Sequence, residues 1–96
     1  MAINFTRPVL DRLNQEITEM ESGIAVLQKK SKSTRSKITQ LEKDCRLSPS
    51  PSALSSKMTR ITKLQAELKK ISRQQLELSK EINKKKTMRA QMSSGQ

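Results

Sequence analysis

Large apolar residues recur along this chain at alternating intervals of three and four positions. In the first half, eleven positions follow that spacing from Leu10 to Cys45, and eight of the first ten are Leu, Ile or Met. A repeat that averages about 3.5 residues keeps one stripe of an α-helix facing a partner helix, as in a coiled coil. The sequence therefore predicts a long helix whose stripe, called the seam below, packs against another helix.

A second seam with the same spacing runs from Leu54 to Met92. Between the two seams, Pro49 and Pro51 each bias the preceding residue away from helical geometry, so the first helix should end before them. We predict one helical-hairpin domain over 1–96, consisting of a flexible N-terminus at 1–6, a first helix at about 7–46, a Ser/Pro turn at 47–52, a second helix at about 53–92 and a flexible tail at 93–96.

A short connection favours antiparallel packing of the two helices. Charge agrees with this arrangement, because acidic residues are concentrated in the first third of the chain and basic residues in the last third. The predicted fold is an all-α, antiparallel coiled-coil hairpin. The residues expected at the helix–helix interface are fourteen large apolar members of the seams: Leu10, Leu13, Ile17, Met20, Ile24, Leu27, Ile38, Leu41, Ile61, Leu64, Leu68, Ile71, Leu78 and Ile82.

Two features of the predicted hairpin suggest further contacts with another chain. Small or polar residues occupy the seam at Ser31, Thr34 and Gln75, and such residues help to fix register and oligomeric state. A pair of helices also leaves much of each helix exposed. We therefore expect self-association into a larger bundle, or docking onto another coiled-coil subunit.

Composition disfavours an enzyme. The chain has no His, which is the commonest general acid and base near neutral pH, and it has no glycine-rich phosphate loop. Cys45 is the single cysteine, so neither an internal disulfide nor a Cys/His zinc site is expected. We predict no catalytic residues, no cofactor-binding residues, no metal ligands and no small-molecule substrate.

Positive charge is the second strong feature, with 20 Lys and Arg against 9 Asp and Glu. The residues predicted to form a basic docking surface lie at 29–37 and on the facing part of the second helix: Lys29, Lys30, Lys32, Arg35, Lys37, Lys69, Lys70 and Arg73. An acidic protein is the leading partner for this surface. Nucleic acid bound through its phosphates, without base readout, is the alternative, because aromatic stacking residues are nearly absent. A purely solubilising role is a further reading, and a membrane surface is disfavoured.

The leading function is a non-enzymatic coiled-coil interaction or assembly subunit whose basic surface docks acidic protein partners. The alternative is a sequence-independent nucleic-acid-binding coiled coil, and a third class is a helical chaperone or adaptor of a secretion or assembly system. Ser48 and Ser50 each precede Pro, which makes them candidate sites of proline-directed phosphorylation. Without a long apolar run or a signal-peptide pattern, we expect an intracellular protein, cytoplasmic or nuclear.

Overall fold

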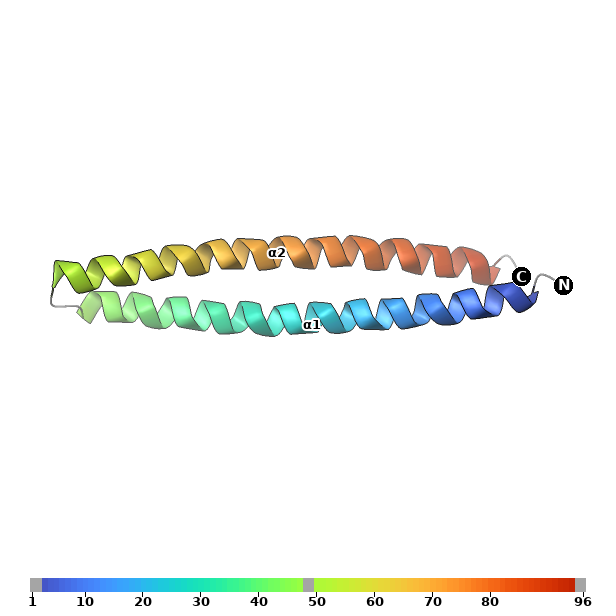
Figure 1. The fold of residues 1–96 in the computed structure, drawn as a ribbon, viewed down its shortest axis with the longest axis horizontal. Helices are drawn as coiled ribbons and strands as arrows, with labels where there is room; N and C mark the ends of the chain where they lie inside the picture. The colour runs from blue at the N-terminus through green and yellow to red at the C-terminus, as the bar shows by residue number, and fades with distance from the viewer. Residues whose placement is uncertain (1–2, 48–49, 95–96) are drawn as a thin grey trace. The chain divides into compact units, whose positions relative to one another are not determined.

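The computed structural model describes residues 3–47 and 50–94, and these form two α-helices (Figure 1). Helix α1 spans Ile3–Leu47 and helix α2 spans Pro51–Ser94. Ser50 is the one described residue outside them. Contacts between α1 and α2 confirm the predicted all-α helical hairpin.

Both helices are longer than predicted. Helix α1 begins at Ile3 rather than near residue 7, so Pro8 lies inside the helix beyond its first turn. Beyond the first turn of a helix, proline removes one backbone hydrogen bond and its ring crowds the carbonyl four residues earlier, which is why the sequence predicts a start close to Pro8. Helix α2 begins two residues early, at Pro51, and extends to Ser94. Within the described residues, neither helix contains an apolar stretch of the length that a membrane-spanning segment needs.

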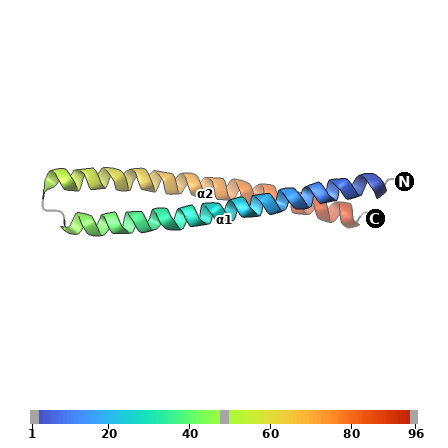
Figure 2. The same cartoon turned by 60° about the horizontal axis from the view of Figure 1, so that its bottom comes forward.

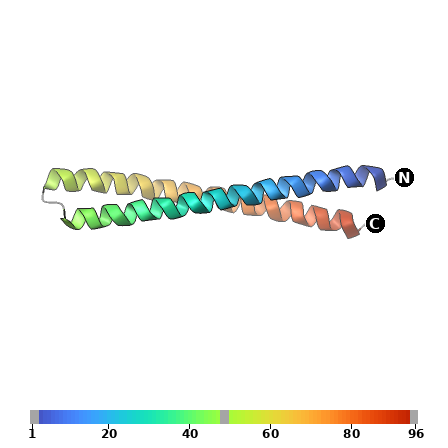
Figure 3. The same cartoon turned by 90° about the horizontal axis from the view of Figure 1, so that it is seen from below.

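The hairpin divides into two compact units. Unit 1 comprises Met1–Val26 and Gln75–Gln96, and unit 2 comprises Leu27–Gln74, which includes the connection between the helices (Figure 2, Figure 3). Each unit therefore contains a segment of α1 packed against a segment of α2. We describe each unit separately.

Burial follows the three–four repeat in both units. The buried apolar residues of unit 1 are Leu13, Ile17 and Ile82, and those of unit 2 are Ile38, Leu41 and Ile71. Every position of the two seams is buried or half-buried, including the polar ones. Among the residues whose burial is described, the others that are not exposed are Glu16, Gly23, Asp44 and Ala53. Burial of each Leu or Ile contributes about 1.5–3 kcal/mol at most, so the seams supply most of the stability.

Ser50 caps the N-terminus of α2. Its side-chain oxygen accepts a hydrogen bond from the backbone N–H of Ala53 (3.2 Å), and its carbonyl accepts one from the N–H of Leu54 (3.1 Å). Pro51 occupies the first helical position, where no partner for its nitrogen is needed. The Ser-Pro pair at 50–51 therefore begins α2 as well as separating it from α1.

Replacing this cap tests its contribution. Ser50→Ala should lower the free energy of unfolding by about 1 kcal/mol, because an amide at the start of α2 loses its acceptor. Urea denaturation followed by circular dichroism measures the change, and Ser56→Ala, at an exposed position inside α2, is the control. Equal stability of the Ser50 variant and the wild type would contradict the capping role.

Gly23 lies inside α1 at a half-buried position of unit 1. A Cβ atom added there would lie 3.5 Å from Cδ1 of Leu78, which is an ordinary van der Waals contact. No glycine among the described residues has a positive φ. Neither backbone geometry nor packing therefore requires glycine at this position.

Gly23→Ala should raise the free energy of unfolding by about 0.5–1 kcal/mol, because alanine loses less conformational entropy in a helix. Thermal and urea unfolding measure the gain. A loss of stability would show that α1 and α2 approach each other more closely at Leu78 than the structure indicates.

Candidate functional site

In unit 1, oppositely charged segments of α1 and α2 lie beside each other. Lys85 donates a hydrogen bond to the carboxylate of Glu16 in a partly buried ion pair. Nζ of Lys86 lies 3.4 Å from Oε2 of Glu21 in a second ion pair between the helices. Six acidic residues of unit 1 offset seven basic ones, which leaves a net charge of +1. The charges of unit 1 are thus nearly balanced within the unit.

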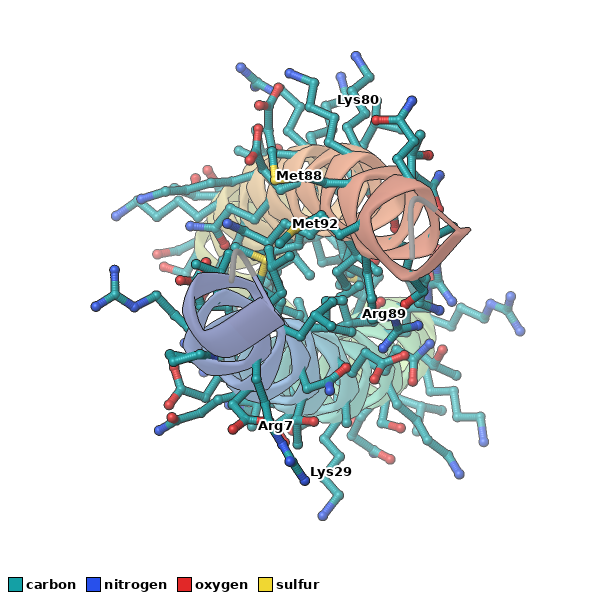
Figure 4. The ribbon with its side chains drawn as sticks, turned by 90° about the vertical axis from the view of Figure 1, so that its right-hand side faces the viewer. Arg7, Lys29, Lys80, Met88, Arg89 and Met92 are labelled. Carbon is teal, nitrogen blue, oxygen red and sulfur yellow. The ribbon has the colours of Figure 1, made fainter. Side chains whose placement is uncertain are left out.

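Two of these cations occupy seam positions of α2. Lys85 is satisfied by Glu16, and the guanidinium of Arg89 donates to the amide oxygen of Asn14 (2.9 Å). Figure 4 shows Arg89 and Met92 on the side of α2 that faces α1, whereas Lys80 extends away from it. Charge patterning anticipates the pair with Glu16. It misses Asn14, because an uncharged side chain gives no signal in such a pattern.

Unit 2 has a very different charge balance. It contains thirteen Lys and Arg against three Asp and Glu, a net charge of +10 out of +11 for the chain. All eight residues of the predicted basic docking surface belong to this unit and are exposed. Among the described residues, none of these eight takes part in an ion pair. Their positive charge is therefore available to a partner.

The eight cations are distributed around unit 2 instead of forming one flat face. An α-helix turns by about 100° per residue, so Lys29, Lys30 and Lys32 point in three different directions from α1. Lys69, Lys70 and Arg73 lie within an arc of about 100° on one side of α2. Lys29 extends into solvent in Figure 4. We call the eight residues together the basic collar.

Two of the small or polar seam residues, Ser31 and Thr34, lie in the same unit as the basic collar. Ser31 and Thr34 are buried, with 8% and 7% of their surface exposed. No buried side-chain polar atom in the described part of the chain lacks a hydrogen-bond partner. Small side chains at two consecutive seam positions bury less apolar surface than Leu or Ile would, so the packing there is weaker than at Ile38 and Leu41.

A shallow groove without charged residues lies at the beginning of α2. It is lined by Pro51, Leu54, Ser55, Met58, Thr59 and Thr62. Two large apolar side chains of unit 2 are strongly exposed, Leu47 at 80% and Met58 at 56%. The sequence pattern gives no sign of this groove, because its residues are apolar only in part.

The candidate phosphorylation sites and the single cysteine lie near the connection between the helices in the sequence. Ser50 is exposed as well as acting as the cap of α2, and Ser48 lies outside the described residues. Cys45 is a half-buried free thiol. Within the described ranges, no group of three or more His, Cys, Asp or Glu side chains is placed to hold a metal ion.

Comparison with protein-family models, with curated proteins and with solved structures finds no match to this chain.

The pair of Glu16 and Lys85 can be tested by a double-mutant cycle. Glu16→Gln and Lys85→Met should each change the free energy of unfolding, and the coupling energy between them should be about 0.5–1 kcal/mol, because both groups are partly shielded from water. Urea unfolding of the four proteins at low salt measures it. The pair Glu81 and Lys84, which lies on one helix and is more exposed, is the comparison. Zero coupling would contradict a contribution of this ion pair to the packing of unit 1.

Proposed function

We propose that this chain is a non-enzymatic coiled-coil interaction subunit that docks an acidic protein partner on unit 2. The observation that supports the proposal is the distribution of charge between the units. Unit 1 balances its charges internally, whereas unit 2 holds thirteen cations against three anions. Concentrated positive charge destabilises a compact unit through self-repulsion, and an anionic partner removes that cost.

The apolar features of unit 2 favour a protein over a nucleic acid. The uncharged groove at the start of α2 and the exposed Leu47 and Met58 offer apolar contacts that a protein can cover. Phosphate backbones gain nothing from such surface. The chain also has no Trp or Tyr and a single Phe, so stacking platforms for bases are lacking.

Nucleic acid bound through its phosphates is the second candidate. The observation that favours it is the spread of the basic collar over both helices, since backbone neutralisation needs positive charge without a shaped pocket. This candidate predicts an affinity that falls steeply with salt and does not depend on base sequence.

Charge-matched variants test the proposal. Lys29→Gln, Lys30→Gln and Lys32→Gln together should weaken the binding of poly-L-glutamate by about tenfold, because the basic collar loses three cations. The control replaces Arg7, Arg12 and Lys80 of unit 1 with Gln, which removes the same charge from exposed positions. Its effect should be about twofold or less. Isothermal titration calorimetry measures the affinities, and circular dichroism checks that both variants remain helical.

Two outcomes would contradict the proposal. Equal weakening by the two triple variants would show that net charge alone attracts the polymer. Tighter binding of a random-sequence DNA duplex than of poly-L-glutamate, at the same ionic strength, would favour the nucleic-acid candidate.

A further inference from the structure

In unit 2, the contact between the two helices runs along their length and meets solvent on both sides. We call these two sides the edges of unit 2. An ion pair of unit 1 shows which residues share an edge, because Nζ of Lys86 and Oε2 of Glu21 lie 3.4 Å apart. Each of these two residues directly follows a seam residue that lies three positions, not four, after the previous seam residue. The heptad repeat puts the equivalent residues of unit 2 along one edge of that unit. They are Gln28, Arg35, Glu42, Met58, Gln65 and Ser72, and we call this line the Met58 edge.

The two edges of unit 2 are not equally open. All six residues of the Met58 edge are exposed. On the opposite edge, Lys37, Arg60 and Glu67 are exposed too, and the half-buried residues are Asp44 and Ala53, which lie near the ends of α1 and α2 that are joined by the connection. The two edges therefore differ only at that end of unit 2, where Met58 is exposed.

Apolar surface is available on the Met58 edge. Met58 is 56% exposed, and the shallow groove on α2 contains both Met58 and the seam residue Leu54. Leu54, Ile61 and Leu68 border this edge at successive heptads and are only half-buried by α1. A third helix along the edge would cover their exposed surface, in the way that an amphipathic helix fills a groove between two others.

Charge selects the kind of helix that fits. Residues three or four positions apart share a helix face, so Lys32, Arg46 and Lys69 flank the edge together with Arg35. Glu42 is the one acidic residue of the edge. A docked helix with acidic residues beside its apolar stripe would meet four cations.

A second copy of this chain does not meet that requirement. Its own unit 2 has a net charge of +10, and three of its six acidic residues in unit 1 already form ion pairs. We infer that the Met58 edge of unit 2 docks an acidic amphipathic helix of another protein, which completes a three-helix arrangement with α1 and α2. This inference rests on the proposed function and specifies the mode of docking.

Two stapled helical peptides of identical composition test the inference on the full chain. One has Leu at three–four spacing and Glu at the other positions, so that its apolar residues share a face; in the other the same residues are shuffled around the helix. Fluorescence anisotropy measures both affinities at one ionic strength. The amphipathic peptide should bind at least about tenfold more tightly than the shuffled peptide, because only it can cover the apolar surface of the edge.

Variants of matched charge locate the docking site. Arg35→Gln with Lys69→Gln removes one cation from the Met58 edge and one that flanks it, and Lys37→Gln with Arg60→Gln removes two from the opposite edge. The first pair should weaken binding of the amphipathic peptide about tenfold and the second about twofold or less. Met58→Ser should abolish most of the preference for the amphipathic peptide without changing the affinity for the shuffled one. Circular dichroism verifies that each variant is folded.

The possible failures are distinguishable. Equal affinity for the two peptides, or equal effects of the two charge pairs, would overturn docking of a helix on the Met58 edge while leaving an acidic partner for unit 2 in place. Failure of both peptides and of poly-L-glutamate to bind would overturn the proposed function itself.

Discussion

Packing of the apolar seam of α1 against that of α2 is the interaction on which the rest of the structure depends. Each unit places three Leu or Ile side chains in a buried position, and all other seam residues are at least half-buried. Isolated helices owe little stability to propensity alone, so these contacts keep two long charged helices folded. The positions of Lys85, Arg89 and the basic collar all follow from this packing.

Electrostatics has a different role in each unit. In unit 1, ion pairs between the helices favour the antiparallel arrangement, although exposed pairs contribute less than about 1 kcal/mol each. In unit 2, the basic collar has no ion-pair partner among the described residues, and the seam there includes the small residues Ser31 and Thr34. The uncompensated charge thus lies in the unit whose seam includes these two small polar residues. An acidic protein that binds unit 2 would offset this charge.

Much of this fold can be predicted from the sequence, because a single periodicity determines both the helices and their contact face. The seam positions, the break at Pro49 and Pro51, and the cap at Ser50 all follow from local chemistry. The start of α1 at Ile3 is not predicted, because proline favours the first turn of a helix and Pro8 therefore indicates a start near residue 7.

The candidate site was predictable only in part. Clustering of Lys and Arg in the sequence identifies the basic collar, yet its spread over both helices and the shallow groove near Met58 depend on how the helices pack. Among the described residues, the two edges of unit 2 differ in burial only at Asp44 and Ala53. Periodicity specifies which residues line each edge, but it does not specify how deeply each one is buried.

Hydrogen–deuterium exchange of the full chain, with and without poly-L-glutamate, tests most directly whether unit 2 is the binding unit. Protection should increase in Leu27–Gln74, because neutralising the +10 charge stabilises that part of the hairpin. Exchange in the α1 and α2 segments of unit 1, whose charges are nearly balanced, should change much less. Equal protection of the two units, or greater protection of unit 1, would contradict the assignment of partner binding to unit 2.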